Sequence, residues 1–370
     1  MQFGLFGPCN YSAPSIPRGW PAAPRHFDAA YGRSSLDETY ELFELADRIG
    51  YDWVTVAEHH YHARQLSSNP ITMAAVVAQR VKRARIGVLG VTLPLHNPIR
   101  VAEDLALLDN MCGGRLFVGF FRGVPNEFMT YGTNPEESRE RLYEGLDLIR
   151  AAWAEPEAFG WEGRYHRFRV VSIWPQPAQK PHPRMLVTGT TRETAVYAAQ
   201  QDFDIGIAFQ TAEFAAEQAR IYLEAAHEAG REFSGHNILF RHFAYVAETD
   251  EQALADCREW NHGSLAGVLA PPPEKAAAFG AAMGEIIGTG KFGGVANMMT
   301  ASPLPFFLGS PDTVAEQIAA FEATTGIGRL EIVTSGDVLP HALAMRSATL
   351  FGEEVIPRVR SLTASAATAH

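Results

Sequence analysis

Short apolar runs alternate along the chain with longer segments in which apolar residues recur at helical spacing. The apolar runs, read as strands, are residues 2–6, 51–58, 84–94, 115–121, 184–188, 204–209, 238–247 and 328–334. The helical patterns start near residues 36, 70, 97, 133, 191, 212, 250, 311 and 337. Several runs are apolar on both faces, which is typical of a buried parallel sheet. About eight strand–helix units predict an α/β fold, a (β/α)8 TIM barrel with insertions, as one domain over residues 1–360.

The helix that starts near residue 97 has clear boundary signals. Asn97 can cap it, Pro98 suits its first turn and Gly113 can end it. Apolar residues at steps of three and four between these positions define one face of the helix. We therefore expect this segment to pack against the sheet.

Three segments depart from the strand–helix alternation. Aromatic and β-branched residues around Gly163 predict a small hairpin insertion at about 155–175. Residues 263–309 are rich in Gly, Ala and Pro, which favours a lid or loop insertion. A Gly-x-Gly-x-x-Gly match within it, at 288–293, follows no strand and is interpreted as flexible loop rather than a nucleotide site. Residues 361–370 are small and polar, so a flexible tail is expected.

Composition indicates a small-molecule protein. Forty-two acidic against 31 basic residues give a formal net charge of −11, which disfavours nucleic acid and anionic membranes as partners. No apolar run approaches the length of a membrane span. The three cysteines are far apart and odd in number, and the N-terminal residues 1–7 lack the features of a signal peptide. A cytoplasmic location is expected.

Polar groups that suit an anion follow two neighbouring predicted strands. Arg122 comes directly after a nearly continuous apolar run, and Arg139 lies near the start of the next helix, where the helix dipole disfavours a cation. Thr190 and Thr191 lie at a helix start, where free N–H groups favour phosphate. Each has a simpler reading: an Arg122–Glu127 ion pair, a solvated Arg139, or helix capping by threonine. Together they predict a phosphate-bearing ligand.

The stretch Val56-Ala57-Glu58-His59-His60-Tyr61-His62 follows another predicted strand. In an extended strand His59 and His60 face opposite ways, so a metal site would have to use His60 and His62. We favour the interpretation that one histidine faces the site as an acid/base or hydrogen-bond donor, while its neighbour is buried.

These motifs together resemble the flavin-dependent luciferase-like monooxygenases, a family typified by the bacterial luciferase α subunit. The resemblance rests on "EHH", "TLPLHNPIRVAEDLALLDNMCGGRLFVGFFRG", "YGTNPEESR", "TGTTRETAVYAA" and "LGSPDTVAEQI" in this order. It implies a TIM barrel that binds reduced FMN, with residues 263–309 as a mobile loop over the flavin. Arg122, Arg139, Thr191 and Thr194 match the residues that hold the FMN phosphate, and Thr190, from the helix start described above, is added to the cofactor-binding set.

The same resemblance assigns the remaining site residues. Leu89 and Gly90 match a point, often a non-proline cis peptide, against which the isoalloxazine ring packs. His59 matches the active-site histidine, with Glu58 and His60 as its neighbours; His59 and His60 are the catalytic candidates. Luciferase has a cysteine where this chain has Phe121, so its aldehyde substrate and light emission are not carried over. Phe6, Phe121 and Phe209 predict a pocket for an apolar organic substrate.

The implied activity is that of a two-component monooxygenase. Reduced FMN from a separate NAD(P)H:flavin reductase would react with O2 to a C4a-(hydro)peroxyflavin. That species would oxygenate the substrate by hydroxylation, Baeyer–Villiger insertion or aldehyde oxidation. A homodimer is the simplest assembly. An F420-dependent oxidoreductase of the same barrel type, a metal-dependent TIM-barrel hydrolase and a flavin-binding protein without turnover stay open as alternatives.

Overall fold

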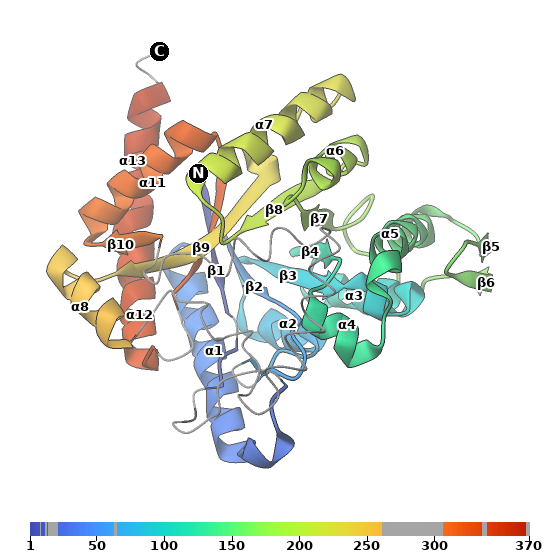
Figure 1. Ribbon diagram of the computed structural model, residues 1–370, viewed down its shortest axis with the longest axis horizontal. Helices are drawn as coiled ribbons and strands as arrows, with labels where there is room; N and C mark the ends of the chain where they lie inside the picture. Colours follow the sequence, from blue (N-terminus) through green and yellow to red (C-terminus); the bar gives the residue numbers. More distant parts are fainter. Residues whose placement is uncertain are drawn as a thin grey trace.

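Eight parallel strands close into a barrel in the computed structural model, which describes residues 1–7, 9–11, 13, 21–62, 65–260, 306–334 and 339–367 (Figure 1). The strands follow the order β9-β11-β1-β2-β3-β4-β7-β8, and β8 pairs with β9 to complete the ring. Their bounds are β1 Gln2–Phe6, β2 Trp53–Val56, β3 Arg85–Thr92, β4 Leu116–Phe121, β7 Arg184–Thr188, β8 Asp204–Ala208, β9 Ile238–Val246 and β11 Arg329–Val333. The predicted (β/α)8 barrel is confirmed.

Helices surround the barrel and follow its strands in sequence (Figure 1). They are α1 Ala29–Ile49, α2 Pro70–Arg80, α3 Pro98–Met111, α4 Pro125–Tyr131, α5 Ser138–Ala154, α6 Arg192–Gln200, α7 Ala212–Glu228, α8 Asp250–Trp260, α11 Pro311–Thr325, α12 His341–Leu350 and α13 Ile356–Ala367. The short helix α4 and the three-residue strand β10 (Phe307–Gly309), which pairs with β9, were not predicted from the sequence.

Local signals set the helix starts. The Asn97 side chain accepts hydrogen bonds from the backbone N–H groups of Ile99 and Arg100, and Pro98 occupies the first turn of α3. Gly113, just past the end of α3, has φ +65°, a conformation that favours glycine. Thr191 caps α6 in the same way, because its hydroxyl accepts from the Thr194 N–H at 3.2 Å.

The segments outside the alternation differ from one another. Strands β5 (Phe159–Glu162) and β6 (Arg167–Val171) pair as an antiparallel hairpin that projects beyond α5 (Figure 1). The expected lid at 263–309 lies outside the described residues except for its last four positions. The expected tail is wrong for residues 361–367, which continue α13. Alanine and leucine favour helix, and the absence of an apolar stripe concealed this from the pattern.

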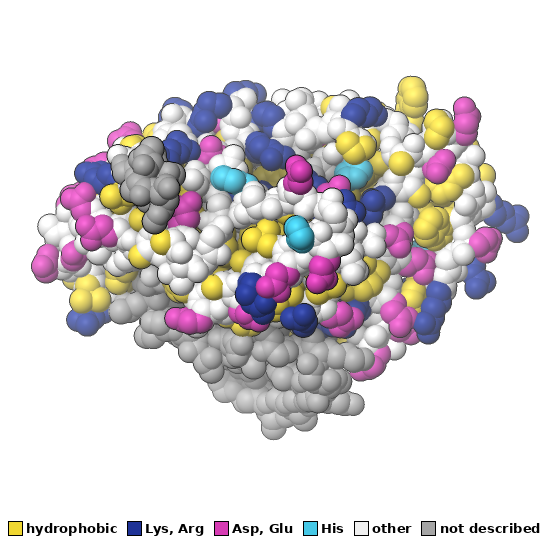
Figure 2. Space-filling view, turned by 90° about the horizontal axis from the view of Figure 1, so that it is seen from above, with side chains coloured by type: hydrophobic (Ala, Val, Ile, Leu, Met, Phe, Trp, Pro, Cys, Tyr) yellow, Lys and Arg dark blue, Asp and Glu magenta, His cyan; other side chains and the backbone are white. Residues whose placement is uncertain are grey.

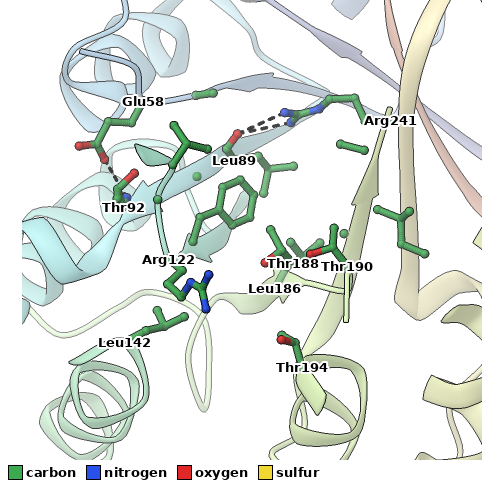
Figure 3. Close-up of a pocket in the computed structure, with 18 of the residues that line it drawn as sticks. Glu58, Leu89, Thr92, Arg122, Leu142, Leu186, Thr188, Thr190, Thr194 and Arg241 are labelled. Carbon is green, nitrogen blue, oxygen red and sulfur yellow. Dashed lines mark hydrogen bonds between the residues drawn. The ribbon is translucent and has the colours of Figure 1, made fainter. Parts of the chain in front are cut away.

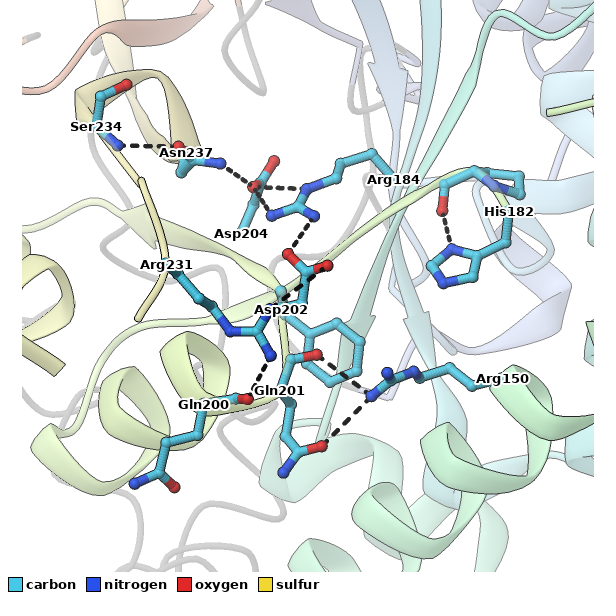
Figure 4. Close-up of polar contacts among 12 residues, drawn as sticks. Arg150, His182, Arg184, Gln200, Gln201, Asp202, Asp204, Arg231, Ser234 and Asn237 are labelled. Atoms are coloured by element: carbon cyan, nitrogen blue, oxygen red, sulfur yellow. Dashed lines mark hydrogen bonds and ion pairs between the residues drawn. The ribbon is translucent and has the colours of Figure 1, made fainter. Parts of the chain in front are cut away.

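The amino-terminal end of the barrel is closed by ion pairs (Figure 4). The Asp204 carboxylate accepts from Arg184 and Asn237 through Oδ1 and from Arg329 through Oδ2, at 2.8, 3.0 and 2.8 Å. Arg184 also reaches Asp202 at 2.8 Å. In TIM barrels the amino-terminal end contributes stability, whereas the loops at the carboxyl end carry the active site. This network of ion pairs and hydrogen bonds is therefore expected to stabilise the fold.

A fully buried carboxylate lies inside the barrel. Glu331 of β11 is fully buried, accepts from Trp53 Nε1 at 2.9 Å and Thr55 Oγ1 at 2.7 Å, and forms an ion pair with Arg241 of β9. A buried charge requires this number of donors to offset its loss of hydration. Apolar side chains of other strands pack in the barrel interior nearby: Trp53, Leu89, Phe117, Leu186 and Leu239.

Acidic and basic side chains are interspersed on the face shown in Figure 2. Within the described ranges, no helix has the length and apolar character needed to cross a membrane.

Candidate active site

A cavity of about 260 Å³ opens at the carboxyl ends of the barrel strands, the end at which TIM barrels carry their chemistry. Figure 3 shows Arg122, Thr190 and Thr194 on one side of it, and Arg241 with the Leu89 carbonyl on the opposite side. Eleven of the residues proposed from the sequence line this cavity: Glu58, His59, Leu89, Gly90, Phe121, Arg122, Arg139, Thr190, Thr191, Thr194 and Phe209.

Two proposed residues do not line the cavity. His60 is 5% exposed and its Nε2 lies 2.7 Å from Glu58 Oε1, so it does not reach a ligand directly. Phe6 is also 5% exposed, because its ring packs under the Arg241 guanidinium at 4.0 Å and in a cluster with Ala57, Phe243 and Val333. His60 and Phe6 therefore lie behind the residues that line the cavity.

Two arginines approach one side of the cavity from different elements. Arg122 follows β4, and Gly123 beside it has φ +100°, which favours glycine. Arg139 lies in the first turn of α5. Burial and the positive charge of Arg139 lower the pKa of Arg122 to about 10. Placing two cations so close is electrostatically unfavourable unless an anion lies between them, so this side of the cavity is suited to a phosphate.

The start of α6 faces the same side. Thr191 and Thr194 hydroxyls are 2.9 Å apart, and the threonine capping that the sequence allowed is present alongside them. The Tyr143 hydroxyl of α5 is buried in the cavity wall and makes no hydrogen bond of normal geometry with the described residues. Burial raises the pKa of Tyr143, which keeps it a neutral O–H donor. The hydroxyl lies beside Thr194 in the cavity wall, within the group of donors that faces this side.

The opposite wall is built around the Leu89–Gly90 peptide of β3. This peptide is cis, as the resemblance implied. A Cβ atom added to Gly90 would lie 2.5 Å from the Gly119 carbonyl oxygen and 2.8 Å from the Phe121 ring, so only glycine can occupy this position. Two Arg241 nitrogens lie 3.4 and 3.5 Å from the Leu89 carbonyl oxygen. The result is a flat wall with one cation at its edge.

His59 lies at the mouth of the cavity and is oriented by a carboxylate. Its Nδ1 is 3.2 Å from Oε1 of Glu127, whose side chain is only 4% exposed. The other oxygen of Glu127 accepts from the Val124 N–H at 2.9 Å, which anchors this carboxylate at the start of α4. An Nδ1–H that donates to Glu127 leaves Nε2 as the ring nitrogen that can accept or release a proton.

Glu58 is the shared hydrogen-bond partner of His60 and His96. Its Oε1 lies 2.7 Å from both His60 Nε2 and His96 Nε2, and its Oε2 accepts from the Thr92 N–H at 2.8 Å. Burial alone would raise the pKa of Glu58, but hydrogen bonds from His60 and His96 lower it to about 2. The two adjacent histidines thus have separate carboxylate partners. Over the described parts of the chain, no group of three or more His, Cys, Asp or Glu side chains is arranged to hold a metal ion.

Three of the cavity residues that sequence reasoning missed carry polar groups that matter for the chemistry: Glu127, Tyr143 and Arg241. Glu127 was considered only as an alternative partner of Arg122, whereas it pairs with His59. Arg241 is a charge within an apolar strand, the same signal that identified Arg122, and could have been found in that way. Tyr143 carries no local signal, because only the fold brings this residue of α5 beside Thr194 of α6 in the cavity wall.

Comparison with known proteins identifies the family of the chain. Residues 16–327 match the family model described as luciferase-like monooxygenase. The chain is 27% identical over 229 residues to the oxygenase component of flavin-dependent trigonelline monooxygenase from Acinetobacter baylyi, covering 61% of this chain and 63% of that protein. The match to 4-hydroxyprotoasukamycin monooxygenase from Streptomyces nodosus is 26% over 339 residues, with 88% and 87% covered.

A solved structure extends the likeness over nearly the whole chain. The monooxygenase RslO1 from Streptomyces bottropensis superimposes with a TM-score of 0.76 at 28% identity, covering 96% of this chain and 99% of its own. By contrast, the match spans slightly less than two thirds of the trigonelline enzyme, and likewise 63% of a limonene 1,2-monooxygenase from Rhodococcus erythropolis. Because the family model matches most of the chain, the chain belongs to the luciferase-like monooxygenase family.

Proposed function

We propose that this protein is the oxygenase of a two-component, FMN-dependent monooxygenase. It would take reduced FMN and O2 as cosubstrates and transfer one oxygen atom to an apolar organic molecule. The observation that carries the proposal is the placement of Arg122 and Arg139 on one side of the cavity, which the start of α6 also faces. A terminal phosphate would accept hydrogen bonds from these groups and balance their positive charge.

The chain's own residues would divide the remaining tasks. The flat wall at Leu89–Gly90 would support an aromatic ring, and Phe121 and Phe209 would keep the reacting region apolar. His59, held by Glu127, would hold or move a proton at Nε2 beside the ring. Bound reduced FMN would supply the oxygen activation, with a C4a-(hydro)peroxyflavin as the oxygenating species.

A separate reductase and a cytoplasmic location belong to the same proposal. One relative is described as the oxygenase component of a flavin-dependent monooxygenase, which supports a partner that delivers reduced flavin. The three cysteines are free and buried, which suits a reducing compartment.

We also propose a homodimer. Val76 of α2 and Leu107 and Met111 of α3 are 39%, 50% and 43% exposed, and α2 packs against α3, so an apolar strip is available to a second copy.

The decisive experiment mixes the protein anaerobically with reduced FMN and then with O2 in a stopped-flow spectrometer. We expect tight binding of reduced FMN and a transient with the near-ultraviolet absorbance of a C4a-(hydro)peroxyflavin, whose decay is accelerated by the substrate. Binding of F420 with hydride transfer and without this transient would replace the proposal by the F420-dependent alternative. Binding of FMN without any reaction with substrates would indicate a flavin-binding protein.

A histidine substitution tests the proton role. For His59→Asn we expect reduced FMN to bind normally, while the oxygenation rate falls by at least about 100-fold, the usual effect of losing a general acid/base. His227, on α7 and outside the cavity, provides the control as His227→Asn. Unchanged formation and decay of the transient in His59→Asn would remove His59 from the mechanism.

A further inference from the structure

A carboxylate already occupies a position beside the two arginines of the cavity. Glu193 of α6 forms an ion pair with Arg139 of α5, and this pair bridges the two helices. Glu193 is 61% exposed, whereas Arg139 is 28% exposed, so the arginine is the more fixed member of the pair. Two acids close to Arg139 in sequence pair with other arginines: Glu137 with Arg141 and Glu140 with Arg164.

The charge of Glu193 reaches the other groups on this side of the cavity. Burial and Arg139 lower the pKa of Arg122, and the negative charge of Glu193 acts in the opposite direction. The same negative charge contributes to raising the pKa of Tyr143. Glu193 therefore lies where the charge of a ligand phosphate would act on the same three side chains.

We propose that Glu193 is an internal competitor of the phosphate: its carboxylate neutralises Arg139 until a phosphate displaces it. This inference rests on the phosphate site of the proposed function. Without a negative charge, Arg122 and Arg139 would repel each other across the cavity wall. Glu193 relieves this repulsion, and it thereby lowers the net gain when a phosphate binds.

The displacement requires no rearrangement of the backbone. An exposed glutamate has several rotamers, so its carboxylate can turn away into solvent. In the first turn of α6 it also remains favourable to the helix dipole after it releases Arg139. Glu193 thus sets the affinity for ligands that carry a phosphate, and not for those that lack one.

The test compares two matched variants, Glu193→Gln and Glu213→Gln. Glu213 lies in the first turn of α7, as Glu193 does in α6, and it is exposed and outside the cavity. Both variants remove one negative charge and the same helix-dipole interaction. Dissociation constants of FMN, riboflavin and inorganic phosphate would be measured by flavin fluorescence and calorimetry for both variants and the unmodified protein.

We expect Glu193→Gln to bind FMN and inorganic phosphate about two- to five-fold more tightly, the size of an exposed ion pair, and riboflavin as before. Glu213→Gln should change none of the three. Weaker or unchanged binding of FMN and phosphate by Glu193→Gln would overturn the inference and assign Glu193 a role in orienting Arg139. If the protein bound no flavin while Glu193→Gln still gained affinity for phosphate, the flavin assignment would fail and the competition would stand.

Discussion

At the amino-terminal end of the barrel, Asp204 accepts hydrogen bonds from Arg184, Arg329 and Asn237. At the carboxyl end, Arg122 and Arg139 lie near enough for one to lower the pKa of the other. The first end surrounds a buried carboxylate with its donors, whereas the second places two arginines close together, with Glu193 paired to Arg139. The difference teaches that a buried charge by itself does not identify a ligand-binding site. Like charges around one cavity are the better indication of such a site.

The largest expected effect comes from breaking the amino-terminal network with Arg329→Met. Arg329 and Asp204 side chains are 7% and 4% exposed, so the loss leaves a buried carboxylate oxygen without its donor. We expect the free energy of unfolding to fall by about 3 kcal/mol, while FMN affinity of the folded protein is retained. Urea unfolding followed by circular dichroism measures the first quantity and fluorescence titration the second.

The matched variant at the other end is Arg122→Met. It should change the free energy of unfolding by less than about 1 kcal/mol and weaken FMN binding about 10- to 100-fold, because a charge-assisted hydrogen bond is lost. If both variants lost stability equally and neither lost FMN affinity, the contrast between the two ends would be incorrect.

The pH dependence of stability extends the comparison to Glu58 at the carboxyl end of the barrel. Both oxygens of this carboxylate have hydrogen-bond partners. Its folded-state pKa of about 2 is below the ordinary value of 4.5, so its contribution is complete above pH 4.5 and declines as the pH falls toward 2. Between pH 6 and pH 3 we expect the wild-type protein to lose about 2 kcal/mol of unfolding free energy relative to Glu58→Gln. A constant difference between the two proteins would show that Glu58 is not held ionised by His60 and His96.

The smallest effects are expected for two stacked tyrosines, Tyr143 and Tyr197, whose ring centroids are 3.7 Å apart. Neither buried hydroxyl has a hydrogen-bond partner of normal geometry in the described structure, but only Tyr143 lines the cavity. Each Tyr→Phe change should raise unfolding free energy by up to about 1 kcal/mol. Only Tyr143→Phe should also weaken FMN binding, by about five-fold. Equal FMN affinity in the two variants would exclude the Tyr143 hydroxyl as a phosphate ligand.

The barrel could be predicted because its signals are local. Asn97, Pro98 and Gly113 mark the two ends of α3 through capping and backbone conformation. The strand runs are apolar on both faces, which is typical of a buried parallel sheet. Helix α4 and the end of α13 were missed, because the first is short and the second has no apolar stripe. Whether such segments become helical depends on tertiary packing.

The site was predictable where a residue type conflicts with its surroundings. Arg122 after an apolar strand is such a conflict, and the structure places it at the cavity. Glu127 and Tyr143 were not predictable, because only the packing of the fold brings Glu127 of α4 to His59 and Tyr143 of α5 into the cavity wall. The sequence assigned Phe6 and His60 to the site, but both side chains are buried behind the residues that line the cavity. A position at a strand end does not show whether a side chain lines a pocket or packs beneath it.

The carboxylate of Glu331 has a consequence for redesign of this enzyme. It links Trp53, Thr55 and Arg241, and through Arg241 it reaches the Leu89 carbonyl, so one polar network joins strands β2, β3, β9 and β11. Truncating Arg241 to enlarge the pocket would remove a partner from a fully buried charge. Variants with wider substrate range should therefore be sought at the rim, around Phe121 and Phe209, while the bottom of the pocket is kept constant.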